Sequence, residues 1–121
     1  MFLQSHRIQS KKERETLFTQ GNSFVEYPFK FVWTCAPAPA FSAKLLVSVP
    51  KKRLRHAVDR NFVKRRIRET VRLFEKEHSA QLPHSELRVA VIFLSENALQ
   101  CPQNYENLRK GLQKIFFPAV N

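Results

Sequence analysis

One helical pattern, from His56 or Ala57 to about His78, constrains this chain more than any other feature of its 121 residues. The apolar residues that recur at helical spacing along one side of it are Val63, Ile67, Val71 and Phe74. The polar residues on the broadly opposite side are Asn61, Lys64, Arg65, Arg68 and Arg72. Such a helix buries the first set against a core and presents the second set, nearly all cations, to solvent.

Most of the positive charge lies in the segment from Lys51 to Arg72. The whole chain has 21 Lys and Arg against 10 Asp and Glu, a net charge of +11. Ten of the basic residues fall in this segment and only Asp59 and Glu69 oppose them, so it carries +8 and leaves +3 for the rest. A helix face that is merely solvated usually mixes both signs of charge. We therefore interpret the segment as a surface that binds a polyanion.

The rest of the chain predicts two further helices and a small sheet. The expected helices cover residues 9–20 and 103–117, and the first has Ser10 as its N-cap and Gly21 as its stop. The expected strands cover residues 23–27, 29–35, 44–49 and 88–94. Residues 36–40 alternate Ala and Pro and are expected to form a loop. The order αβββαβα predicts one α+β domain over residues 1–121, a four-stranded sheet backed by helices.

The period-two pattern of residues 29–35 assigns their side chains to two faces of the sheet. Those expected in the core are Phe29, Phe31 and Trp33, and those expected on the other face are Lys30, Val32 and Thr34. In the first helix, Leu17 is expected to pack on the core. Phe18 could pack beside it or belong to a binding surface, and the residues leave both interpretations open. Cys35 and Cys101 stand in no metal-like or redox-like pair and are expected to be buried free thiols.

The chain lacks the clustered carboxylates that a metal-dependent nuclease needs, whereas general acid–base chemistry by one of its four His is not excluded by the sequence. It has one Asp, and its nine Glu are scattered among Lys and Arg, so no carboxylate cluster for a catalytic metal is predicted. With two Gly in all, it cannot build a Gly-rich phosphate loop. Its longest apolar runs are too short to cross a bilayer, and no signal peptide is recognised. We expect a cytoplasmic binding protein with no catalytic residue, metal site or membrane contact of its own.

Two stretches resemble the protein component of bacterial ribonuclease P. Residues 44–52 read Lys-Leu-Leu-Val-Ser-Val-Pro-Lys-Lys, and residues 57–69 read Ala-Val-Asp-Arg-Asn-Phe-Val-Lys-Arg-Arg-Ile-Arg-Glu. That family has a strand ending in two Lys, a short turn with Gly-Asn, then Ala-Val and a helix that carries Arg-Asn-Arg and Lys-Arg. Residues 7–8 and 17–23 are similar to the family's first helix and the turn after it. With the order of elements, the resemblance covers essentially the whole chain.

The resemblance implies a function and a topology. In that family a catalytic RNA, with Mg²⁺, hydrolyses the phosphodiester bond that removes the 5′ leader from precursor tRNA. The protein binds this RNA through the Arg-Asn-Arg helix and holds the leader in a cleft between the first helix and the sheet. The protein is expected to bind no cofactor of its own and to supply no catalytic group. The family's βαβ crossover is left-handed, against the usual preference.

Site residues follow from matching this sequence to the family pattern and from the charge of the segment. Those expected to bind RNA are Lys51, Lys52, Arg53, Arg55, Arg60, Asn61, Lys64, Arg65, Arg68 and Arg72. Those expected to line the leader cleft are Arg14, Phe18, Lys30, Val32 and Ser48.

The sequence also departs from the family pattern. Phe62 stands where the second Arg of Arg-Asn-Arg is expected, and Arg65 or Arg66 could replace that contact; Phe62 itself is expected to pack rather than to recognise RNA. Arg14 and Val32 stand where aromatic residues are usual, so stacking on the leader is expected to be weaker and ionic contact stronger.

Two other functions fit the charge. A structural RNA-binding protein of the ribosome or of an assembly would need the same cations but no leader cleft. A DNA-binding module would place a helix in the major groove, with Asn61, Lys64, Arg65 and Arg68 as the base-reading row. Competition between duplex DNA and structured RNA separates these possibilities.

Overall fold

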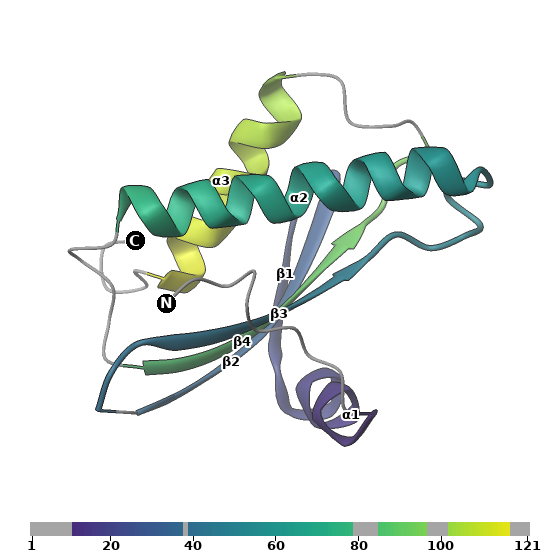
Figure 1. The fold of residues 1–121 in the computed structure, drawn as a ribbon. Helices are drawn as coiled ribbons and strands as arrows, with labels where there is room; N and C mark the ends of the chain where they lie inside the picture. The colour runs from purple at the N-terminus through teal and green to yellow at the C-terminus, as the bar shows by residue number, and fades with distance from the viewer. Residues whose placement is uncertain (1–10, 38, 79–84, 97–101, 117–121) are drawn as a thin grey trace.

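The computed structural model describes residues 11–37, 39–78, 85–96 and 102–116, and it confirms the expected order αβββαβα (Figure 1). The elements are α1 (Lys11–Gln20), β1 (Asn22–Glu26), β2 (Phe29–Pro37), β3 (Ser42–Ser48), α2 (Ala57–Glu77), β4 (Ser85–Phe93) and α3 (Pro102–Phe116). The four strands form a middle layer. Helices α2 and α3 lie on one side of it and α1 on the other (Figure 1).

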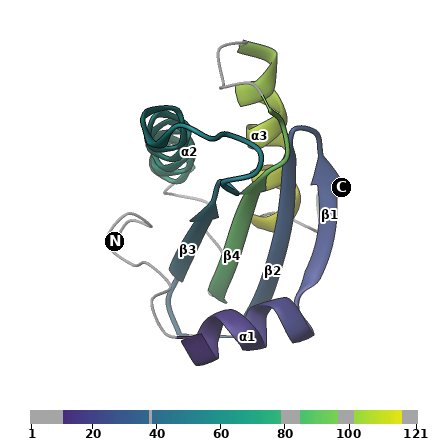
Figure 2. The same ribbon diagram turned by 90° about the vertical axis from the view of Figure 1, so that its right-hand side faces the viewer.

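The sheet is mixed, with the strands in the order β1-β2-β4-β3 (Figure 2). Strands β1, β2 and β4 are antiparallel neighbours, whereas β3 runs parallel to β4. Parallel neighbours need a long crossover connection, and α2 lies within the one that joins β3 to β4. The last residues of β3 therefore lead directly toward the start of α2.

The main core fills the space between the sheet and the two helices α2 and α3. All four residues of the predicted apolar stripe of α2 are buried there, as are Phe29 and Phe31 of β2. From α3 the buried apolar residues are Leu108, Leu112, Ile115 and Phe116. Where α3 crosses β2, Gly111 lies directly on the ring of Phe31: a Cβ atom at Gly111 would be 2.3 Å from two ring atoms. The absence of a side chain at Gly111 thus allows the close approach of α3 to the sheet.

A smaller apolar cluster lies on the opposite face of the sheet, under α1. It consists of Leu17 from α1, Val32 from β2 and Ala90 from β4, and the half-buried Leu46 and Ile92 pack against it. Strand β4 is therefore covered on both faces, as its nearly continuous apolar sequence predicts. Because α1 covers only part of this face, side chains on the rest of it stay partly exposed to solvent.

Strand β2 extends beyond its predicted end, as far as Pro37. The prediction of a loop over residues 36–40 is therefore wrong for Ala36 and Pro37. Ala36 and Pro37 still pair with Glu86 and Ser85 of β4. Strand β1 pairs with β2 only as far as Trp33, so the other edge of β2 no longer has a strand partner at Pro37. Proline is tolerated at such an edge because its missing N–H leaves no ladder bond unmade there.

Two smaller expectations are also settled. Cys35 is exposed rather than buried, because it lies in the part of β2 that extends past β1. Helix α1 ends just before Gly21, as predicted; the Gly21 N–H donates to the Leu17 carbonyl at 2.8 Å, and a Cβ atom there would be 2.4 Å from that oxygen. Ser10 and Cys101 lie outside the described residues.

Candidate nucleic-acid interface

Four of the predicted RNA-binding residues meet on the outward face of α2. Asn61, Lys64, Arg65 and Arg68 line a hollow of about 380 Å³. Their spacing of three, four and seven residues places them on one side of a helix, and the half-exposed Arg72 follows one turn after Arg68. The helix thus presents hydrogen-bond donors around a single concave surface, which suits the oxygens of a phosphate backbone.

The turn between β3 and α2 carries four more of these cations. Pro50 closes it, since its carbonyl accepts the Arg53 N–H at 2.9 Å and the Leu54 N–H at 3.3 Å. Leu54 is 5% exposed and is part of the main core, so it anchors the turn. Lys51 and Lys52 project into solvent, as does Arg55, while Arg53 is half-buried. The turn leads directly into α2, so its cations continue the surface formed on that helix.

Two arginines of α2 point elsewhere. Arg60 turns back toward the turn, where its Nη1 donates to the carbonyls of Leu54 at 2.9 Å and Arg55 at 2.7 Å. Arg66 turns toward α3: its Nε donates to the Tyr105 hydroxyl at 3.1 Å, and its Cζ lies 4.8 Å from the Tyr105 ring centroid. Arg66 therefore links α2 to α3 in this structure. Of the two suggested replacements, only Arg65 lies in the hollow.

Phe62 is 38% exposed, and Val58 one turn earlier is 78% exposed. Phe62 thus lies at the border between the buried and the exposed sides of α2, as expected, and its role in packing rather than in recognition stays a prediction. The buried stripe of α2 is centred on Val63 and Ile67, and the side chain of Phe62 leaves the helix about 100° away from that of Val63.

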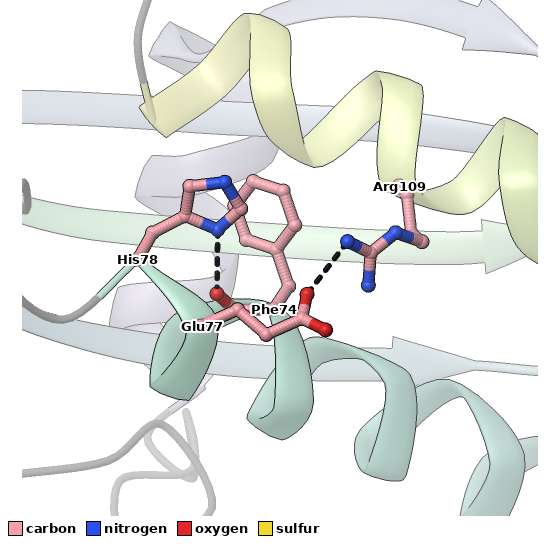
Figure 3. Close-up of polar contacts among 4 residues, drawn as sticks. All are labelled: Phe74, Glu77, His78 and Arg109. Carbon is pink, nitrogen blue, oxygen red and sulfur yellow. Dashed lines mark hydrogen bonds and ion pairs between the residues drawn. The ribbon is translucent and has the colours of Figure 1, made fainter.

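The far end of α2 is fastened to α3 by contacts that the sequence did not indicate (Figure 3). Glu77 forms an ion pair with Arg109 at 2.6 Å, and the Arg109 guanidinium lies 5.6 Å from the Phe74 ring centroid. Within the end of α2 itself, the His78 ring is tilted against the Phe74 ring, with the two centroids 4.3 Å apart, and its Nδ1 lies 2.9 Å from the Phe74 carbonyl oxygen. Arg66 and Glu77 thus link two separate parts of α2 to α3.

A second hollow, of about 480 Å³, lies along α1. Its described lining residues are Lys11, Arg14, Glu15, Phe18 and Thr19. Phe18 is 48% exposed while its neighbour Leu17 is buried, so Phe18 lies at the surface and not in the core, and its part in a binding surface stays a prediction. Arg14 is exposed one turn before Phe18. An aromatic ring and a cation thus stand side by side at this hollow.

The sheet residues predicted for the leader cleft share the face that α1 covers, but they differ in access. Lys30 and Ser48 flank Ile92 of β4 in one row of the sheet, and both are half-exposed. Val32 is 4% exposed because Leu17 and Ala90 pack on it. Its prediction as a cleft contact is therefore wrong: it faces the expected side, yet α1 itself occupies the space that a ligand would need.

Neither a metal site nor a membrane span is seen in the part of the chain that the structure describes. Within residues 11–37, 39–78, 85–96 and 102–116, no three His, Cys, Asp or Glu side chains are grouped so that they could hold a metal ion. Among the same residues, no helix is both long and apolar enough to cross a membrane.

Comparison with known proteins assigns the chain to a family. The family model described as Ribonuclease P matches residues 2–119. A ribonuclease P protein component of Porphyromonas gingivalis is 36% identical over 91 residues, which are 74% of this chain and 66% of that protein. The matched segment thus spans slightly less than two thirds of that relative.

Solved structures of the family share the fold. A Staphylococcus aureus RNase P protein mutant superposes with a TM-score of 0.66 at 24% identity, over 93% of this chain and 88% of that one. The RNase P protein from Thermotoga maritima superposes with a TM-score of 0.57 at 17% identity, over 92% and 94% of the two chains. With a family model that matches nearly every residue and a relative that bears the same name, this chain belongs to the ribonuclease P protein family.

Proposed function

We propose that this chain is the protein subunit of ribonuclease P in tRNA processing, and that it binds the catalytic RNA through α2 and the turn before it. The observation that carries the proposal is the hollow formed by Asn61, Lys64, Arg65 and Arg68. Its polar side chains come from a helix that Arg66 and Glu77 fasten to α3. A cationic surface of this kind gains affinity by releasing counterions from the RNA backbone.

The second part of the proposal is that the hollow along α1 receives the single-stranded 5′ leader of precursor tRNA. Exposed aromatic rings stack on unpaired bases, and nearby cations follow the backbone. Phe18 supplies the ring, and Arg14 and Lys11 supply the charge. Lys30 and Ser48 lie on the face of the sheet that α1 covers and would extend the contact, whereas the buried Val32 would not take part.

The chemistry in this proposal belongs to the RNA and its Mg²⁺ ions. The protein contributes binding energy and a reduction of the charge repulsion between the two RNA molecules, and we expect it to do so in the cytoplasm. Because cations of the protein substitute for part of the counterion charge, its effect should be largest where Mg²⁺ is scarce.

Reconstitution with a bacterial ribonuclease P RNA tests this function. Cleavage of a precursor tRNA at low Mg²⁺ should increase when the protein is added, and the increase should shrink as Mg²⁺ is raised. The double variant Arg65→Ala/Arg68→Ala should lose most of the effect. A matched control, Lys76→Ala/Lys110→Ala, removes the same charge at exposed positions away from the hollow and should keep it. If both double variants lose the increase in cleavage to the same extent, the protein acts through its net charge alone and the assigned surface is wrong.

Binding competition separates the RNA-binding proposal from a DNA-binding module. The protein should bind the structured RNA at salt concentrations at which an unlabelled duplex DNA of equal length does not displace it. Displacement by duplex DNA at equimolar phosphate would instead favour a helix that reads the major groove.

A further inference from the structure

The side chain of Arg60 is used inside the protein, although its position in the sequence suggests a contact with RNA. Its Nη1 carries two hydrogens, and these are directed to two carbonyl oxygens, of Leu54 at 2.9 Å and of Arg55 at 2.7 Å. Both carbonyls belong to the segment that joins the turn to α2. One side chain from the first turn of the helix thus ties down the chain that leads into it.

Few other contacts hold this segment in place. His56 stands at the N-cap of α2 in an extended conformation, and it makes no side-chain capping hydrogen bond. A helix usually uses such a bond to fix its entering chain. The turn itself is closed by the two bonds to the Pro50 carbonyl and anchored by the buried Leu54. Between Leu54 and the helix, the two bonds from Arg60 add a side-chain link.

The segment also needs a link for electrostatic reasons. Lys51, Lys52, Arg53 and Arg55 lie within five residues, and like charges so close repel one another. The first turn of α2 contains one acidic residue, Asp59. A flexible loop would relieve the repulsion by spreading, and its cations would then have to be ordered again upon binding, at a cost in affinity. Bonds from a guanidinium to backbone carbonyls resist this spreading without neutralising any of the charge.

We propose that Arg60 is a positioning residue that holds the turn of residues 51–55 in the shape that binds RNA. The inference rests on the proposed function, because it concerns how this surface is preorganised. Arginine suits the role because its planar guanidinium holds its N–H donors in fixed directions, whereas the three donors of a Lys ammonium rotate on a flexible stem.

The salt dependence of binding distinguishes a positioning residue from a single phosphate contact. Removing one contact should lower the log–log slope of affinity against salt by roughly 0.7–0.9. Arg65→Ala, at an exposed position in the hollow, should show this single step with the ribonuclease P RNA. Arg60→Ala should lower the slope by about twice as much or more, since contacts of Lys51 and Lys52 are lost with it. A single step for Arg60→Ala would overturn the proposal.

A double-mutant cycle gives the second criterion. Independent contacts have effects on affinity that multiply within about a factor of two. If Arg60 acts through the turn, Arg60→Ala should cost much less in a Lys51→Ala/Lys52→Ala background than in the wild type. Effects that simply multiply would show that Arg60 acts alone. If the folded Lys51→Ala/Lys52→Ala and Arg65→Ala variants both bind like the wild type, the RNA interface itself is wrong, which is a different failure.

Arg60→Lys provides a variant that keeps the charge and guards against the case in which Arg60→Ala does not fold. We expect Arg60→Lys to fold, to bind the RNA more weakly than the wild type, and to exchange its Arg53 and Leu54 amide hydrogens faster. Amides of β2 and β4 serve as the internal control and should exchange as before. Wild-type affinity with unchanged exchange at Arg53 and Leu54 would overturn the proposal. Arg65→Lys, as the matched substitution, should retain nearly full affinity.

Discussion

Replacing Gly111 by Ala should destabilise the domain, although the same change favours a helix elsewhere. The added Cβ atom would lie 2.3 Å from Cε1 and Cζ of Phe31 and 2.9 Å from its Cε2. Real Cβ contacts do not occur at such distances, so the ring or the helix must move. The ring is confined, because Phe24 stacks on it with the centroids 5.0 Å apart and Phe29 meets it edge-on at 6.4 Å.

The expected magnitude follows from two opposing contributions. Overpacking a core usually costs about 1–3 kcal/mol, and a clash this short with a confined ring belongs in the upper half of that range. The higher helix propensity of Ala returns about 1 kcal/mol. The free energy of unfolding should therefore fall by about 1–2 kcal/mol. For a domain of this size, that corresponds to a decrease in Tm of roughly 4–10 °C.

Urea and thermal unfolding, followed by circular dichroism, measure this change. Phe31→Leu is the partner substitution, since it removes the ring atoms that the new methyl group meets. In a double-mutant cycle, Gly111→Ala should cost clearly less in the Phe31→Leu background than in the wild type. The reasoning is refuted if Gly111→Ala unfolds at the same or a higher urea concentration, because α3 would then have room at Gly111 that the structure denies.

Three further predictions concern the function and the surface. Phe18→Ala should weaken holoenzyme affinity for tRNA with a 5′ leader by on the order of 1–3 kcal/mol if a base stacks on it. Arg14→Ala should weaken this affinity less and with more dependence on salt. The affinity for mature tRNA should not change in either variant, and equal losses of affinity for the two substrates would contradict the leader cleft. Protein freed of all RNA should not cleave precursor tRNA with any divalent metal, and cleavage that Asp59→Asn abolishes would contradict a binding role. In a Cys101→Ser variant, the exposed thiol of Cys35 should react with a thiol reagent at the rate of an unstructured Cys peptide, whereas protection until unfolding would contradict its exposure.

Local periodicity predicted α2 almost to the residue, because its apolar stripe is long and regular and the row of cations marks the opposite side. It also assigned the side chains of β2 to the correct faces. It could not show which residues would cover those faces. Val32 faces the expected side of the sheet, yet Leu17, from a helix distant in sequence, packs over it. Accessibility depends on such tertiary contacts, and the pattern within one strand does not record them.

The roles of the arginines show the same limit. Arg60, Arg65 and Arg66 are the same residue type within two helical turns, and charge alone made them equivalent. Arg65 faces the hollow, Arg60 binds carbonyls five and six residues earlier, and Arg66 meets a tyrosine 39 residues later. The direction of Arg66 could have been read from helix geometry, since it is 100° from Arg65 toward the side on which the last helix packs. The carbonyl partners of Arg60 depend on the shape of the turn.

The position of β4 determines when this domain can fold during synthesis. It lies between β2 and β3, so β3 cannot join the sheet until residues 85–93 have left the ribosome. By then the whole basic segment of residues 51–72 has already emerged, with its apolar stripe uncovered and its cations near ribosomal RNA. Pairing between residues so distant in sequence delays folding. A chain that ends before Ser85 should accordingly show no cooperative unfolding, and its basic segment should bind RNA without discrimination.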